Sequence, residues 1–206
     1  MIRRCLFRNQ RHLFKRKDDA GGREIFSGMP QSAPLKVYEI DFWKSDGWNP
    51  TEYGREYDFS RPFFAQFLDL FRAVPWPSRS VQFMANSDYC DQAGYLKNCY
   101  LCFDCDNDED SAYCVRFHYC KNSFDLTEAF SSELSYDSLS INKCYKSFFS
   151  VDCENSIEIW FSKNLAGCSN CFWGVSLRNK SFYIFNEPYS KEDYFQEIKK
   201  WDLGSY

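Results

Sequence analysis

The chain has 206 residues, with 21 Phe, 14 Tyr, 6 Trp and 11 Cys, and its 29 acidic residues outnumber its 25 basic ones. This length fits one or two domains with a sizeable core, and no stretch approaches the roughly 18 uninterrupted apolar residues of a membrane-spanning helix, which excludes an integral membrane protein. Because His12 and His118 are the only histidines, a three-histidine metal site is excluded as well.

The N-terminus is strongly basic, while the rest of the chain is acidic. Residues 1–17 contain seven basic and no acidic side chains, namely Arg3, Arg4, Arg8, Arg11, Lys15, Arg16 and Lys17. Such a cluster either contacts nucleic-acid phosphates or pairs with the acidic remainder of the protein. The charges interrupt the apolar run that a secretory signal needs. We therefore expect a cytoplasmic protein whose thiols are not paired in disulfides.

Residues 1–80 predict a small α+β module. Turn residues surround Ile25 and Phe26, which indicates a hairpin, and a strand-like run follows between Val37 and Trp43. A broad apolar face predicts a helix near 61–74, with Ser60 as its N-cap and Pro75 as its end.

Residues 81–187 repeat a short unit in which a polar residue precedes a small one and then an aromatic or aliphatic one. Examples are Asn98-Cys99-Tyr100, Asn122-Ser123-Phe124 and Asn170-Cys171-Phe172. From Tyr89 to Phe182 the mean step is about 11.6 residues. Units this short must stack to bury their apolar side chains. Residues 188–206 then predict a C-terminal capping helix, with Ser190 at its N-cap.

We expect a mainly β fold, specifically a right-handed-type β-solenoid. Two units per coil predict about 23 residues per coil and four to five coils, with the aromatic residue of each motif pointing inward and loops of variable length at the corners. An antiparallel sandwich, with a turn at each repeat unit, is the main alternative.

The cysteines allow three interpretations. Cys99, Cys102 and Cys105, with Cys120 as a fourth ligand, have spacings that suit zinc or an iron–sulfur cluster. Yet Cys99, Cys144 and Cys171 occupy the repeat position that serines occupy elsewhere, which indicates a need for a small side chain. We therefore expect buried thiols, no metal and no cofactor. Reactive thiols near residues 99–120 are the third alternative.

Trp160 and Trp173 are the best candidates for a surface that binds a sugar or a nucleobase, because strand alternation places both side chains outward. Packing beneath a loop or the C-terminal helix is the competing interpretation.

Three blocks of sequence resemble a family of uncharacterised cysteine-rich proteins from candidate phyla radiation bacteria. They are FRNQR with LFKRK at 7–17, WKSDGWNPTEYGREYDFSRPFF at 43–64 and LRNKSFYIFNEPYSKEDY at 177–194. The resemblance implies N-terminal zinc-ribbon knuckles before a repeat domain. The positions where that family has two C-x-x-C pairs hold Asp18 and Gly21, then Glu39 and Phe42. We therefore expect a degenerate zinc ribbon that packs aromatic side chains instead of binding metal.

The sequence contains no recognisable set of acid, base and nucleophile. We expect a non-enzymatic binding or scaffold protein whose partner, protein or nucleic acid, is not specified. Nucleic-acid binding through the basic segment and an enzyme centred on the cysteines remain the alternatives.

Overall fold

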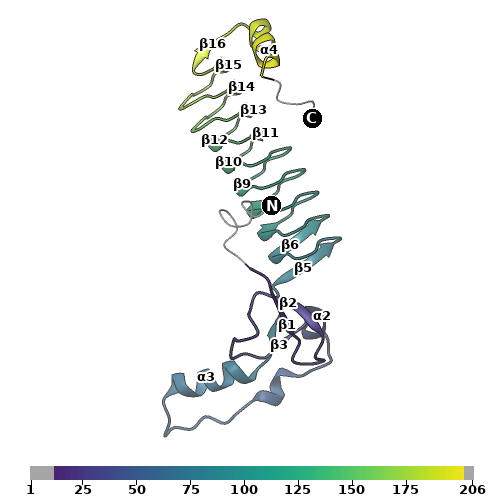
Figure 1. The fold of residues 1–206 in the computed structure, drawn as a ribbon. Helices are drawn as coiled ribbons and strands as arrows, with labels where there is room; N and C mark the ends of the chain where they lie inside the picture. Colours follow the sequence, from purple (N-terminus) through teal and green to yellow (C-terminus); the bar gives the residue numbers. More distant parts are fainter. Residues whose placement is uncertain (1–11, 202–206) are drawn as a thin grey trace.

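The computed structural model describes residues 12–201. It is an elongated rod in which stacked coils carry a small module at one end and a helix at the other (Figure 1). The fold is mainly β, a β-solenoid of about nine turns with few helices, which confirms the solenoid prediction at this level. Within the described residues, no helix is long and apolar enough to cross a bilayer.

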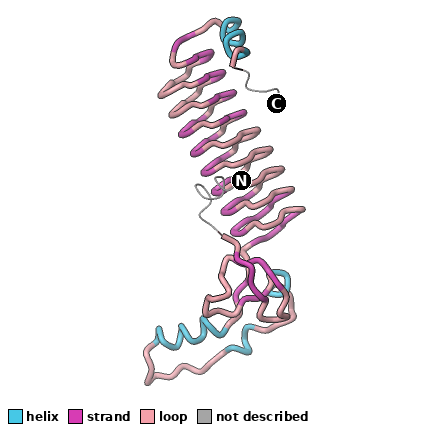
Figure 2. Tube along the Cα trace, viewed as in Figure 1, coloured by secondary structure: helices cyan, strands magenta, loops and turns pink. Residues whose placement is uncertain are grey.

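Two parallel sheets run along the solenoid, with loops between the strands of each coil (Figure 2). The first consists of β5 (Val81–Ala85), β6 (Asp91–Lys97), β7 (Phe103–Asp106), β8 (Val115–His118), β9 (Thr127–Phe130), β10 (Leu139–Asn142) and β12 (Val151–Glu154). The second consists of β11 (Tyr145–Phe148), β13 (Ile157–Trp160), β14 (Ser169–Phe172) and β15 (Ser181–Ile184), with the antiparallel strand β16 (Glu187–Pro188) at its edge.

Each coil is one repeat unit long, not two. Parallel pairing joins residues 12 apart, from Val81↔Ala93 at the first coils to Phe172↔Ile184 at the last. The predicted pairing of two units in a coil was wrong because each unit closes a whole turn by itself. The corners are also constant in length. The spacing of the sequence motif varies because the aromatic residues of successive units occupy different positions in the coil.

Left-handed backbone at every third residue explains how so few residues close a turn. In one coil, Asn98, Leu101, Asp104 and Asn107 all have φ between 53° and 59°. The repeating element is therefore one inward residue, one outward residue and one left-handed residue, and four such elements make a four-sided coil. Non-glycine residues adopt this conformation at a cost of roughly 1–2 kcal/mol each. The packing of each coil against its neighbours must offset that cost at every corner.

The inward positions hold small residues that also form hydrogen bonds. The hydroxyl of Ser111 donates to Glu109 O at 2.8 Å and accepts from Ser123 N, one coil later, at 3.2 Å. Cysteine acts in the same way, since Cys90 Sγ accepts from Cys102 N at 3.4 Å. These bonds satisfy inward backbone N–H groups, and a buried N–H without a partner would be costly. Serine and cysteine replace one another at the inward positions because both are small side chains that accept a hydrogen bond.

The aromatic side chains of the repeat point outward, contrary to the prediction. Tyr100 and Phe124 are 43% and 45% exposed, whereas the preceding residues, Cys99 and Ser123, are buried. The interior of so short a coil has no room for one large ring per unit. Larger side chains enter it mainly on one side, where Phe117, Ile141 and Leu165 lie two coils apart in the same position.

The N-terminal module begins with a hairpin of β1 (Phe14–Lys17) and β2 (Glu24–Ser27). Strand β3 (Val37–Tyr38) pairs with β4 (Trp76–Pro77). Between them lie helix α2 (Ile40–Trp43), the 3-10 helix η1 (Pro50–Tyr53) and helix α3 (Phe63–Ala73). The helix predicted near 61–74 is present, but it begins after Pro62, and Ser60 instead bonds to Asp58. A zinc-ribbon fold is not confirmed.

Helix α4 (Lys191–Lys199) lies against the last coil of the solenoid. Ser190 is its N-cap, and the Ser190 hydroxyl accepts from Asp193 N at 3.1 Å. The buried Tyr194 packs edge-on against Phe182, with ring centroids 5.7 Å apart. The helix therefore covers apolar surface that the end of a solenoid would otherwise expose.

Candidate functional site

An aromatic ladder runs along one edge of the C-terminal half of the solenoid. Its outer column consists of left-handed corner residues 12 apart, and a second column of outward residues lies next to it. We define the ladder as Phe149, Phe161, Trp173 and Phe185 in the outer column, with Tyr136, Phe148, Trp160 and Phe172 in the second. The four outer side chains are between 37% and 54% exposed. An exposed apolar strip of this kind usually marks an interaction surface.

The rings of the outer column stack on one another. Phe149 and Phe161 have centroids 4.9 Å apart and planes within 4°, and Trp173 and Phe185 are 5.2 Å apart with planes at 30°. Phe161 and Trp173 are 5.7 Å apart. Such pairs contribute about 0.5–1.5 kcal/mol each beyond the area they bury. This stacking offsets the cost of placing bulky residues in the left-handed conformation.

Stacking also determines what the ladder offers to a ligand. Trp173 lies between Phe161 and Phe185, so its two faces are occupied by neighbours and its ring edge is exposed. Trp160 is half-buried and stacks on Phe148 at 4.1 Å. A sugar or nucleobase needs an open ring face. Both tryptophans therefore lie on the predicted surface, but Trp173 does not offer an open stacking platform.

The end of the described chain extends the ladder. The Trp201 ring lies 5.3 Å from Phe172 and 6.3 Å from Phe185, measured between centroids. A related contact occurs where the N-terminal module meets the solenoid, because Phe26 of β2 packs edge-on against Tyr89 at 4.8 Å. In both places, an aromatic side chain from another segment covers an aromatic edge of the solenoid.

The ten cysteines of residues 12–201 are all unpaired and buried. Burial raises the pKa of the Cys120 thiol to about 12 and that of Cys153 to about 11. Donation of the Cys99 thiol to the neighbouring Cys102, together with burial, raises the pKa of Cys99. These environments disfavour the thiolate, which is the form that attacks substrates and binds metals.

The set Cys99, Cys102, Cys105 and Cys120 does not form a metal centre. No group of three or more His, Cys, Asp or Glu side chains in the described part of the chain is arranged to hold a metal ion. The Cys102 and Cys105 thiols instead donate to Tyr100 O and Phe103 O, at 3.6 Å and 3.2 Å.

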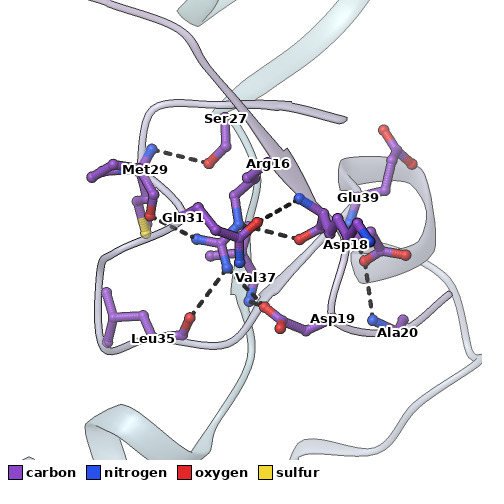
Figure 3. Close-up of polar contacts among 12 residues, drawn as sticks. Arg16, Asp18, Asp19, Ala20, Ser27, Met29, Gln31, Leu35, Val37 and Glu39 are labelled. Carbon is purple, nitrogen blue, oxygen red and sulfur yellow. Dashed lines mark hydrogen bonds and ion pairs between the residues drawn. The ribbon is translucent and has the colours of Figure 1, made fainter. Parts of the chain in front are cut away.

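Of the seven basic residues in the N-terminal segment, Arg3, Arg4, Arg8 and Arg11 lie outside the described residues. Lys15 forms an ion pair with Glu24 at 2.8 Å, and Lys17 is exposed. Arg16 is buried and points into the module, where it pairs with Asp19 at 2.8 Å and donates to Pro30 O at 3.2 Å (Figure 3). A guanidinium held in this way is not available to a phosphate.

Asp18 organises the loops next to Arg16. Its carboxylate accepts from Gly21 N at 2.8 Å and from both Ala20 N and Glu39 N at 3.2 Å (Figure 3). The two loops that hold Asp18 and Glu39 are thus joined by hydrogen bonds. Tyr38 packs against Phe42 and Trp48, as the predicted aromatic packing of this module requires.

The sequence prediction missed most of the ladder because it assigned the aromatic residues to the interior. The useful signal is the recurrence of aromatic residues at positions 12 apart, which Phe149, Phe161, Trp173 and Phe185 show. The sequence matches no protein-family model and no curated protein. The family resemblance described above therefore stays a prediction.

Proposed function

We propose that the protein is a non-enzymatic binding or scaffold protein that docks another polypeptide along the aromatic ladder. The exposed, stacked outer column, from Phe149 to Phe185, is the observation that carries this proposal. Ring edges in a continuous strip suit burial against apolar side chains, and aromatic residues are enriched at the energetic centres of protein interfaces.

The chain's own contacts support a polypeptide as the partner. Trp201 already packs against the ladder rings Phe172 and Phe185. The nucleobase or sugar alternative is less well supported because neighbouring rings occupy both faces of Trp173.

The other two hypotheses receive less support from the described residues. The nucleic-acid hypothesis is weakened because Arg16 is buried in an ion pair with Asp19 and cannot contact a phosphate. A cysteine enzyme near residues 99–120 needs a low thiol pKa, whereas the pKa of Cys120 is raised. Both remain predictions. Salt-dependent binding measurements on a variant with Arg3, Arg4, Arg8 and Arg11 replaced by glutamine test the first, because this variant keeps strand β1 and the buried Arg16.

Peptide selection tests the proposal. Random peptides displayed on phage are selected on the native protein, and the affinity of each selected peptide is measured for the Phe161→Ser/Trp173→Ser variant. We expect peptides with aromatic anchors whose affinity falls about tenfold or more in this variant.

Tyr95→Ser is the matched control, because Tyr95 is also exposed and stacked, on Phe83 at 4.7 Å, but lies outside the ladder. Peptides that bind the ladder variant as tightly as the wild-type protein would contradict the proposal. Circular dichroism verifies that each variant is folded.

A further inference from the structure

One side of the solenoid, formed by β7, β8, β9, β10 and β12, has an apolar column between two acidic edges. The column consists of outward residues 12 apart, among them Val115, Thr127 and Leu139, which pair across successive coils. A column of left-handed corner residues forms each edge, and five of these corner residues are acidic, whereas Arg116 is basic. The acidic ones are Asp104, Asp125, Glu128, Asp137 and Asp152. We call this surface the acid-edged side.

Outward positions at the start of the acid-edged side are buried, which indicates that another segment covers them. Phe103 and Val115 are 2% and 9% exposed, whereas Val175, further along the same column, is 52% exposed. Asp125 is 7% exposed, although Phe149, two coils later in the same corner column, is 38% exposed. A carboxylate buried this deeply needs a cationic or hydrogen-bonding partner. The covering segment must therefore reach Asp125 and pair with a carboxylate.

The N-terminal module contacts the solenoid where the acid-edged side begins. Phe26 packs against Tyr89, which lies three coils before Asp125 in the same corner column. A Cβ atom at Gly28 would lie 2.7 Å from Asp91 Oδ2, and Asp91 occupies the first position of the column that continues as the apolar column. The end of β2 therefore lies next to the start of this side.

The chain that precedes β1 starts from the same point. Strand β1 is antiparallel to β2, and Phe14 pairs with Ser27 at the end of β2. Residues 1–11 precede the described part of the chain, and an extended segment of this length spans at most about 36–40 Å. Strands of successive coils are about 4.8 Å apart, so Asp137 lies about 19 Å along the rod from Tyr89, four coils earlier. Residues 1–11 are therefore long enough to reach Asp137.

The composition of residues 1–11 complements the acid-edged side. The segment has four arginines, no acidic residue and several apolar side chains. These are Arg3, Arg4, Arg8 and Arg11, with Ile2, Leu6 and Phe7 among the apolar residues. Arginine suits partly buried ion pairs, because its guanidinium is weakly hydrated and can donate two parallel hydrogen bonds to one carboxylate. A nucleic acid does not suit this side, because its phosphates would meet the acidic edges.

We propose that residues 1–11 dock along the acid-edged side, with arginines paired with Asp125 and Asp137 and apolar side chains on the column between the edges. The segment then acts as an internal strap that joins the N-terminal module to the middle of the solenoid. Its positive charge is used within the protein, in contrast to the nucleic-acid hypothesis.

Photocrosslinking tests the proposal on the full-length protein. The photoreactive residue p-benzoylphenylalanine replaces Phe7, and crosslinks in the irradiated monomer are mapped by digestion and mass spectrometry. We expect crosslinks to peptides that contain residues 103–140. Crosslinks that fall mainly outside these residues, crosslinks between two chains, or a yield no higher than in urea-unfolded protein would overturn the proposal.

Two variants test the role of charge. One replaces the four arginines of residues 1–11 with glutamine, and the other is Asp125→Asn/Asp137→Asn. Each should lower the crosslink yield at least about twofold, because partly buried ion pairs hold the segment in place. Asparagine also adopts the left-handed conformation of these corners, and circular dichroism verifies that each variant is folded.

Asp110→Asn is the matched control. Asp110 is also an acidic left-handed corner residue of the solenoid, but it lies in another corner column, where its carboxylate accepts from Asn98 Nδ2 at 2.7 Å. This variant should keep the wild-type yield. An unchanged yield in both charge variants, or an equal loss in Asp110→Asn, would also overturn the proposal.

Discussion

The backbone N–H of Ser135 donates to the side-chain hydroxyl of Ser123, one coil earlier, at 3.1 Å. The Ser135 hydroxyl in turn accepts from Ser147 N at 3.2 Å and donates to Glu133 O at 3.1 Å. A column of inward side chains therefore supplies hydrogen-bond acceptors for the inward backbone N–H groups of the next coil. The identity of an inward residue affects the stability of the coil that follows it.

Replacing Ser135 with alanine should destabilise the protein by about 1–3 kcal/mol, because the buried Ser147 N–H and Glu133 C=O each lose a partner. Ser135→Cys should cost less, since Cys99 and Cys171 occupy equivalent positions in other coils. Urea denaturation measures the difference. Ser131→Ala, at an exposed corner, is the control. Equal effects of Ser135→Ala and Ser131→Ala would contradict the role of the hydroxyl column.

Asp108 should make stability depend on pH. Its carboxyl is buried in the coil interior, where Oδ1 accepts from Cys120 N at 2.9 Å, and burial raises its pKa from 3.8 to about 8. Because the folded state holds the proton more tightly than the unfolded state, the stabilisation is complete below about pH 4. It is lost as the pH rises, at up to about 1.4 kcal/mol per pH unit, until about pH 8.

Asp108→Ser should remove most of this dependence and stabilise the protein at pH 8, since serine occupies the equivalent inward position at Ser132 and Ser156. Urea denaturation at pH 5 and pH 8 measures both effects. A variant with the same loss of stability between these two values as the native protein would show that other groups cause it.

The buried thiols should react slowly in the native state. At pH 8, the raised pKa of residues such as Cys120 and Cys171, both about 12, leaves little thiolate, and burial blocks access. Alkylation followed by peptide mass spectrometry measures each site. We expect modification of the ten described cysteines to be at least about a hundredfold slower in native protein than in denatured protein. Fast native modification at any position between Cys99 and Cys120 would instead favour the enzyme hypothesis.

Asp19→Asn should destabilise the N-terminal module more than the solenoid. The variant leaves the buried Arg16 guanidinium without its carboxylate. Because the Asp19 side chain is 36% exposed, we expect a cost of roughly 1–3 kcal/mol, less than for a fully buried ion pair. Hydrogen exchange should show lost protection in residues 14–77 and retained protection in residues 103–184. A uniform loss along the chain would mean that both parts unfold as one unit.

Local patterns in the sequence were sufficient for several features. The exchange of Cys and Ser at equivalent positions predicted small buried side chains, and the motif at Ser190 predicted helix α4. The coil length was not predictable in the same way, because left-handed φ values at residues such as Leu101, Tyr113 and Phe161 contradict local preference and cannot be inferred from residue type. The contact between Phe26 and Tyr89 was not predicted because it joins segments that are distant in sequence.

The sequence by itself determined that residues 81–187 stack as repeated units with thiols and hydroxyls inside, because short units cannot bury their apolar groups alone. Only the tertiary structure decided that one unit closes one coil and that the aromatic rings face outward. The physical reason is that contacts between coils, both ring stacking and side-chain acceptors for inward N–H groups, stabilise a backbone conformation that each residue would avoid in isolation.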